Sequence, residues 1–192
     1  MILTPYAYAT EQQPDYIEFE SETCVLEVSW RYPSPLEVFF LNSGKRTPFK
    51  VLHTANYRGH VATWALKDGV LFLTKVAVKE NEIDLDKLLP GKVMNSEVKA
   101  DWFSGVVVVK KGKHRNTLPG GHYSIEYKSY IFLRFNQGVL ANKFILSSDE
   151  YYREVEEYSS RWGTNNPVVD GAIYEYEQYI RSFRGNNERS SE

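Results

Sequence analysis

The chain has 192 residues, of which 42% are hydrophobic and 25% charged, and this ordinary globular composition argues against an intrinsically disordered protein. Its 23 Lys and Arg residues against 25 Asp and Glu residues give a net charge of −2, so the positive whole-molecule field that attracts nucleic acid or an anionic membrane is absent. No stretch approaches 18 consecutive apolar residues, and the sequence therefore predicts no membrane-spanning helix.

Residues 1–14 are polar, contain Pro5 and Pro14, and predict a loosely ordered entry segment. They lack the basic and apolar regions of a signal peptide. The single cysteine, Cys24, cannot form an intramolecular disulfide, which fits a reducing compartment. We therefore expect a cytoplasmic protein.

Alternation of apolar and polar residues begins at Asp15 and predicts two strands. Ile17 and Phe19 share one face of the first. The apolar face of the second holds Cys24, Leu26, Val28 and Trp30. On such a face, Cys24 is expected to behave as a small hydrophobic residue with a raised, unreactive thiol pKa.

The strongest pattern is a hairpin with arms at 57–67 and 70–78. Asp68-Gly69 joins the arms and suits a type I′ turn, because both central residues of that turn take positive φ. Almost every side chain in the arms is apolar or small, so we expect both faces to be covered and the hairpin to lie at the centre of a sheet. Before it, a short apolar run at 38–41, a turn at 42–45 and a strand at about 49–53 are expected.

After the hairpin, the pattern predicts a short helix over 83–89 that stops at Pro90-Gly91. A strand at 106–109 then leads into a basic loop over 110–115, which is expected to be a solvated tip. A second hairpin follows, with arms at 123–135 and 139–146.

The period changes to helical from Ser147, and a second helix is predicted to begin at Pro167. Residues 185–192 form a polar tail that we expect to be frayed. Strands first and helices last predict the α+β class: a mainly antiparallel sheet of hairpins followed by two C-terminal helices, as one domain over residues 15–184.

Two motifs in the middle of the chain carry a family resemblance. The first is R-G-H-V-A-T-W at 58–64, continued by Asp68-Gly69, Leu71 and Leu73, and the second is A-D-W-F-S-G at 100–105. They are similar to a loose group of uncharacterised bacterial proteins with an R-G-[YH]-x-A-T-W-x-[IL]-x-D-G-x-L-x-L run and a downstream A-D-W-[FY]-[ST]-G. The resemblance covers about 50–110 and implies no activity.

Arg58 and Asp101 are charges inside apolar, aromatic sequence, so each must reach solvent or be paired. We expect a structural Arg58–Asp101 salt bridge. The alternative is a polar cluster at the floor of a pocket walled by Tyr57, Trp64 and Trp102. The candidate ligand contacts are accordingly Tyr57, Arg58, His60, Asp101 and Trp102.

Catalytic and metal-binding motifs are incomplete. His53 and His60 lack further ligands at a metal-binding spacing, and His122-Tyr123-Ser124 lacks the second His-x-Ser triplet of a two-histidine phosphoesterase. We therefore expect no metal and no cofactor, and the balance is against an enzyme.

Fourteen tyrosines favour a protein interface, because tyrosine combines a large apolar body with a polar hydroxyl. The leading hypothesis is a non-enzymatic protein-interaction or regulatory domain of bacterial or phage origin, with another protein as its partner. The alternative is a small-molecule or nucleotide pocket, a hydrolase included, around Arg58, His60, Asp101 and Trp102. Homo-oligomers are compatible with either hypothesis, whereas nucleic acid is disfavoured. The candidate surface residues are Tyr151, Tyr152, Tyr174 and Tyr179.

Overall fold

The computed structural model describes residues 12–29, 32–117 and 123–153. The chain divides into two compact units, residues 1–148 and residues 149–192, which are described separately. The predicted single domain over 15–184 stays a prediction, because much of it lies outside the described residues. The helix expected from Pro167 and the polar tail over 185–192 also lie outside them.

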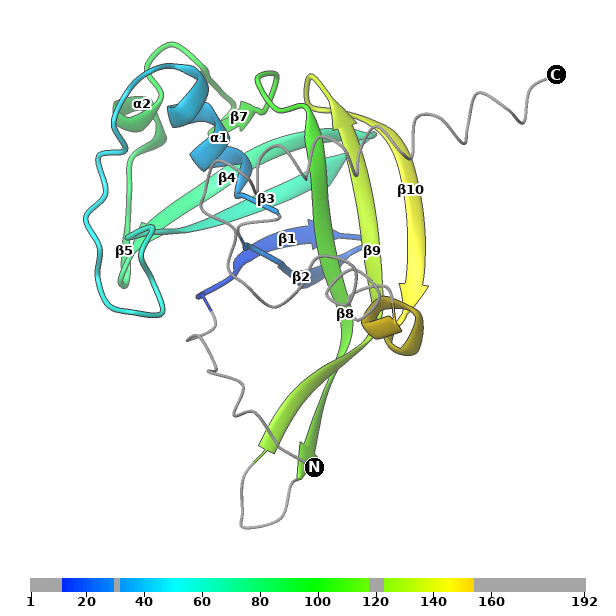
Figure 1. The fold of residues 1–192 in the computed structure, drawn as a ribbon. Helices are drawn as coiled ribbons and strands as arrows, with labels where there is room; N and C mark the ends of the chain where they lie inside the picture. The colour runs from blue at the N-terminus through cyan, green and yellow to red at the C-terminus, as the bar shows by residue number, and fades with distance from the viewer. Residues whose placement is uncertain (1–11, 30–31, 118–122, 154–192) are drawn as a thin grey trace, which may run out of the picture. The chain divides into compact units, whose positions relative to one another are not determined.

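The described part of the first unit is built on one ten-stranded sheet with two helices (Figure 1). The strands are β1 Asp15–Phe19, β2 Glu22–Leu26, β3 Val61–Lys67, β4 Val70–Val78, β5 Asn81–Glu82, β6 Val93–Met94, β7 Glu97–Lys99, β8 Gly105–Thr117, β9 Tyr123–Asn136 and β10 Val139–Ser147. The helices are α1 Pro35–Asn42 and α2 Leu85–Leu88. This mostly β architecture with few helical residues is compatible with the predicted α+β class.

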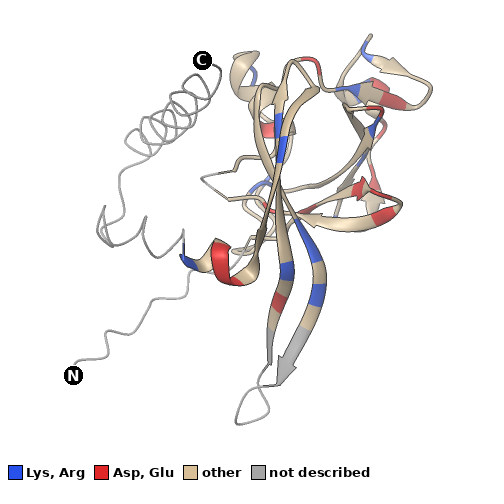
Figure 2. Cartoon of the chain, turned by 90° about the vertical axis from the view of Figure 1, so that its right-hand side faces the viewer, with Lys and Arg blue, Asp and Glu red and all other residues tan. Residues whose placement is uncertain are grey.

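The sheet closes on itself. Its strand order is β10-β9-β8-β2-β1-β3-β4-β7-β6, and β10 also pairs with β4 at Val139 and Val70. We call this closure between β4 and β10 the seam. There the Leu140 N–H donates to the Gly69 carbonyl at 2.7 Å, and the Leu71 N–H donates to the Gly138 carbonyl at 2.9 Å. Figure 2 shows the strands running around the resulting ring.

Both predicted hairpins are confirmed. β3 and β4 are joined by Asp68 at φ 49° and Gly69 at φ 75°, as a type I′ turn requires. β9 and β10 are joined through Gln137 and Gly138, which also take positive φ. Pairing in the sheet is antiparallel except between β1 and β3, which run parallel. The predicted helix over 83–89 is present as the single turn of α2.

The inner face of the closed sheet forms the core. Trp64 is fully buried there, together with Ile17, Leu71 and Leu133. Cys24 is also buried, and burial raises the pKa of its thiol, as expected. The inner face of the β3–β4 hairpin is buried whereas its outer face is half-buried, so only one face is fully covered.

The short apolar run at 38–41 lies in α1, which begins at Pro35 because Ser34 caps it. Two local expectations are wrong. The strand expected at about 49–53 is irregular chain with one isolated bridge between His53 and Asn56. The basic residues expected in a loop over 110–115 belong to β8, which pairs with β9 through Thr117.

The longer β8 gives the sheet a two-stranded arm. β10 stops pairing with β9 at Ser147 and Ser129, whereas β8 and β9 remain paired as far as Thr117 and Tyr123. Figure 2 shows this ribbon projecting from the ring.

Candidate functional site

Asp15, at the start of β1, is the centre of a buried polar cluster. One carboxylate oxygen accepts hydrogen bonds from Arg58 Nη1 at 2.7 Å and the Ala62 N–H at 3.0 Å. The other accepts from Ser34 Oγ at 2.6 Å and Trp64 Nε1 at 3.3 Å. An ionised carboxylate accepts about four hydrogen bonds, so Asp15 has its full complement. We call the four side chains that meet here the Asp15 cluster: Asp15, Ser34, Arg58 and Trp64.

The guanidinium of Arg58 makes its hydrogen bonds within the fold. Besides its ion pair with Asp15, it donates from Nη2 to the Gln13 carbonyl at 2.6 Å, and its side chain is only 7% exposed. The predicted Arg58–Asp101 salt bridge is therefore wrong. Asp101 is exposed and lies 3.6 Å from Lys92 Nζ. The parallel pairing of β3 with β1 is what brings Asp15 to Arg58, which precedes β3 in the chain.

The cluster also fixes the start of α1. Ser34 donates its hydroxyl to Asp15 and accepts from the Leu36 N–H at 3.4 Å, while its own N–H donates to Glu37 Oε2 at 3.1 Å. This capping box satisfies N–H groups that a helix end otherwise leaves open. Burial raises the pKa of Glu37, and the positive charge of Arg58 opposes that shift.

His60 is buried beside the cluster with one ring nitrogen bonded. Its Nδ1 lies 3.0 Å from the Arg58 carbonyl, which can only accept, so neutral His60 carries its proton on Nδ1. Its Nε2 is buried with no hydrogen-bond partner. The Phe49 ring packs against it at a centroid distance of 4.3 Å. Burial lowers the pKa of His60.

The five predicted ligand contacts do not line one pocket. Arg58 and His60 are buried in the fold, whereas Tyr57 is 60% exposed. Trp102 donates from Nε1 to the Pro35 carbonyl at 2.8 Å and packs edge-on against Phe39. Trp64, the other expected pocket wall, lies in the core.

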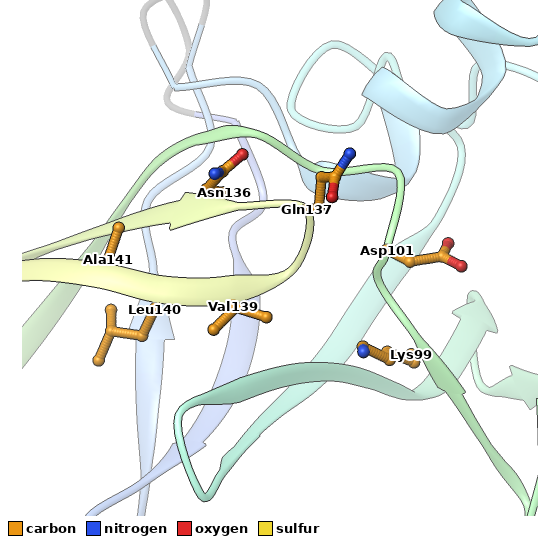
Figure 3. Close-up of a pocket in the computed structure, with 7 residues that line it drawn as sticks. All are labelled: Lys99, Asp101, Asn136, Gln137, Val139, Leu140 and Ala141. Carbon is orange, nitrogen blue, oxygen red and sulfur yellow. The ribbon is translucent and has the colours of Figure 1, made fainter.

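An open depression at the seam includes one predicted contact, Asp101 (Figure 3). It has a volume of about 610 Å³ and is lined by Lys99, Asp101, Asn136, Gln137, Val139, Leu140 and Ala141. The four polar side chains are all exposed to solvent. A ligand there would compete with water for each of them.

The second edge of β10 is a different kind of feature. β10 pairs with β9 along its whole length, but in the described residues its other edge has a strand partner only at Val139. Beyond the seam, most side chains of β10 are exposed, and Ile145 is 55% exposed. Figure 1 shows β10 as the outermost strand of its part of the sheet. We call the outer side of residues 141–147 the edge of β10.

Two basic residues of β8, Lys110 and Lys111, form ion pairs with carboxylates. Lys110 Nζ lies 3.5 Å from a Glu27 oxygen. Lys111 Nζ lies 2.9 Å from Glu20 and 3.6 Å from Glu22. These ion pairs leave less positive charge for nucleic-acid phosphates than the sequence of 110–115 suggests.

The predicted aromatic surface is described only in part. Tyr151 and Tyr152 lie in the helical turns at 148–153, with ring centroids 5.6 Å apart, and Tyr152 is 46% exposed. Tyr174 and Tyr179 lie outside the described residues.

The described residues contain no helix both long enough and apolar enough to cross a bilayer. They also contain no group of three or more His, Cys, Asp or Glu side chains arranged to hold a metal ion.

Comparison with models of protein families, with curated proteins and with solved structures finds no match to this chain.

Proposed function

We propose that this chain is a protein-interaction domain that accepts an extended segment of a partner along the edge of β10. The observation that carries the proposal is the contrast along this strand. Its first residues are tied to β4 at the seam, whereas the following residues extend past the seam with exposed side chains. Exposed strand edges offer N–H and C=O groups to an added strand, which is a recurring mode of peptide recognition.

The side chains of β10 support such a contact. Phe144 stacks on Phe132 of β9 at a centroid distance of 4.5 Å with an interplanar angle of 8°. The stack holds the Phe144 ring against β9, which reduces the side-chain entropy lost when a partner binds the strand. Ile145, on the opposite face of the strand, adds exposed apolar area.

The proposal keeps the character expected from the sequence, a non-enzymatic and regulatory protein of bacterial or phage origin. The polar groups of the Asp15 cluster are bonded to one another, which supports a structural role for them. The exposed ring of Tyr152 supports an aromatic contribution to binding. The buried single thiol of Cys24 supports a reducing, cytoplasmic setting.

Site-specific photo-cross-linking tests the proposal. A photoreactive phenylalanine analogue replaces Ile145 on β10, and a matched variant carries it at Met94, an exposed apolar residue of β6. After irradiation in cells that express the chain naturally, we expect covalent protein adducts at position 145 at least about tenfold above those at position 94, because a partner strand lies within reach of the probe. Equal yields at the two positions would contradict the proposal.

A second candidate function is ligand binding in the depression at the seam, favoured by the position of Asp101 in its lining. A small zwitterion could pair with Lys99 and Asp101 while its carbon skeleton contacts Val139 and Leu140 (Figure 3). NMR titration with a library of amino acids tests this candidate. Shifts confined to the lining residues and lost in Asp101→Ala would support it, and shifts that persist in that variant would not.

A further inference from the structure

We infer that residues 45–57, part of the irregular chain between α1 and β3, bind a segment of a partner protein that is rich in Asp and Glu. We call residues 45–57 the cationic segment. The inference goes beyond the proposed function, because this surface is separate from the edge of β10. Figure 1 shows the chain between α1 and β3 on the left of the sheet and β10 on the right. Each surface can therefore be tested without the other.

The cationic segment lies in the longest part of the chain that has no carboxylate side chain. Residues 38–67 contain no Asp or Glu, and they hold five of the 23 Lys and Arg residues. The other 18 Lys and Arg residues are set against 25 Asp and Glu residues, so the rest of the chain carries a charge of −7. Positive charge is thus concentrated locally in a chain whose overall charge is negative.

Three cations of the segment are exposed and lack a carboxylate partner. Lys45, Arg46 and Lys50 are all exposed to solvent. Within the part of the chain that the structure describes, no ion pair involves any of the three. The other two cations of residues 38–67, Arg58 and Lys67, do form ion pairs. The three exposed cations are therefore available to a partner.

Hydrogen bonds hold the second half of the cationic segment in place. The Leu52 N–H donates to the Asn56 carbonyl at 3.2 Å, and the Asn56 N–H donates to the His53 carbonyl at 2.8 Å. The chain before β1 also bonds to the segment, because the Gln13 N–H donates to the Ala55 carbonyl at 2.6 Å. A backbone that is already fixed reduces the entropy lost when a partner binds.

Two exposed side chains add contact area beside the cations. Residues 50–59 form a narrow loop whose two sides touch, since an added Cβ at Gly59 would lie 2.1 Å from the Lys50 carbonyl oxygen. Val51 and Tyr57, on the two sides of this loop, are each 60% exposed. Tyrosine is common at binding surfaces because its ring packs while its hydroxyl bonds. The segment therefore offers apolar contacts as well as charge.

The number of available cations favours a short acidic segment over a longer polyanion. Strong nucleic-acid binding typically uses about 6–10 phosphate contacts, and basic clusters that bind anionic membranes hold about 4–8 Lys or Arg residues. Here three cations lie within six consecutive residues, which span at most about 21 Å. A longer polyanion would also meet the negative remainder of the chain. An acidic segment of similar length would contact the cations alone, and guanidinium and ammonium groups pair well with carboxylates.

NMR titration of the full-length chain tests the inference, with decaglutamate as the probe and decaglutamine as its neutral counterpart. At about 50 mM salt, where exposed charges are weakly screened, we expect decaglutamate to bind with a Kd below about 1 mM. The amide signals that shift should be those of residues 45–57. Decaglutamine should shift none of them, because it lacks the carboxylates.

Two triple variants with the same net charge show whether position matters. The charge variant replaces the three available cations by Gln: K45Q, R46Q and K50Q. The control variant replaces three exposed lysines outside the segment by Gln: K99Q, K113Q and K128Q. We expect the charge variant to bind decaglutamate at least about tenfold more weakly than wild type, and the control variant to stay within about twofold. Circular dichroism establishes that both variants remain folded.

Each other outcome overturns the inference. No binding of decaglutamate up to about 1 mM, shifts confined to other residues, or equal losses in the two variants would show that the segment does not recognise carboxylates. An oligothymidylate of about 15 nucleotides and vesicles containing phosphatidylserine are tested in parallel. If either binds at least about tenfold more tightly than decaglutamate and is lost in the charge variant, the segment binds nucleic acid or membrane instead. None of these results bears on cross-linking at position 145.

Discussion

At the scale of single residues, the carboxylate of Asp15 is the most heavily used side chain of the site. It is fully buried and accepts from Arg58, Ser34, Trp64 and the Ala62 N–H. Removing one partner of a buried ion pair leaves the other charge in a poorly solvating environment, and the typical cost is about 3–5 kcal/mol. The energetic importance of Asp15 therefore depends on its partners.

A double-mutant cycle tests this dependence. We expect Asp15→Asn and Arg58→Met each to destabilise the protein by about 3–5 kcal/mol, and the double variant to lose about 0.5–3 kcal/mol less than the sum of the two. Denaturant unfolding supplies the free energies. Asp101→Asn is the control, because its exposed contact with Lys92 should contribute under about 1 kcal/mol. Additivity between positions 15 and 58 would contradict the pairing.

His60 predicts a pH dependence of stability. Burial lowers its pKa in the folded protein below the ordinary value of 6.5, so the unfolded chain binds the proton more tightly. His60 therefore contributes full stability above pH 6.5, and that contribution is lost as the pH falls through the pKa of the folded state. The charge of Asp15 and the hydrogen bond to the Arg58 carbonyl oppose this lowering of the pKa, whereas the positive charge of the Arg58 guanidinium adds to it. A single group of this kind changes stability by at most about 1.4 kcal/mol per pH unit.

The measurement compares wild type with His60→Phe, which fills similar space and does not titrate. The difference in unfolding free energy between them should be constant above pH 6.5 and should shift against wild type at lower pH. The comparison cancels the contribution of Glu37, whose pKa is raised by burial. Parallel curves for the two proteins down to pH 5 would show that His60 does not titrate on unfolding.

At the scale of elements, the seam contains a glycine whose surroundings leave no room for a side chain. Gly138 has a φ of +74°, and an added Cβ would lie 2.6 Å from the Ala100 carbonyl oxygen. Gly69, across the seam, has a φ of +75° and nothing within 4 Å of its Cβ position. The two glycines therefore have the same backbone requirement and different steric surroundings.

This contrast gives a matched pair of variants. Gly69→Ala should cost about 1–2 kcal/mol from left-handed backbone strain alone. Gly138→Ala should cost about 1–3 kcal/mol more, because the Ala100 backbone must move. Thermal or denaturant unfolding of the two variants gives the difference. Equal losses would mean that the contact with Ala100 relaxes without cost.

The sequence predicts those elements whose signals are local. Asp68-Gly69 and Asn136-Gln137-Gly138 specify their hairpins because a tight hairpin turn needs positive φ, which Asp68, Gly69, Gln137 and Gly138 adopt. Helix α1 also had a local signal, Ser34 followed by Pro35 and Glu37, but the apolar run after it fits a strand or a helix equally well.

The remaining features depend on residues far apart in the chain. The parallel pair β1–β3 and the seam between β4 and β10 have no local signature. The expected pairing of Arg58 is confirmed, but its predicted partner, Asp101, is wrong, because the true partner Asp15 is brought to it by a non-local strand pairing. One signal was available: Asp15 shares the buried face of β1 with Ile17 and Phe19, which marks it as an inward-facing charge.

At the scale of the whole molecule, the closed sheet joins segments that are distant in sequence. β2 pairs with β8 between Leu26 and Val109, and the seam bonds Gly69 to Leu140. Such non-local contacts must form before the sheet is stable, and each requires a long loop to close.

We therefore expect slow folding, on the scale of about milliseconds to seconds, as in other proteins dominated by non-local strand pairing. Stopped-flow fluorescence can follow the reaction, because Trp64 passes from solvent to a fully buried position. Folding within microseconds would contradict this expectation, because it would show that closure of the sheet between β4 and β10 is not rate-limiting.

The Asp15 cluster also has a consequence for descent. A lineage that loses the carboxylate must pass through an ancestor with a buried, uncompensated guanidinium, and selection for folding removes such ancestors. Asp15, Ser34, Arg58 and Trp64 should therefore be inherited or replaced together, while their exposed neighbour Tyr57 drifts. The quartet would then remain as a signature of common ancestry in homologues whose surfaces have diverged completely.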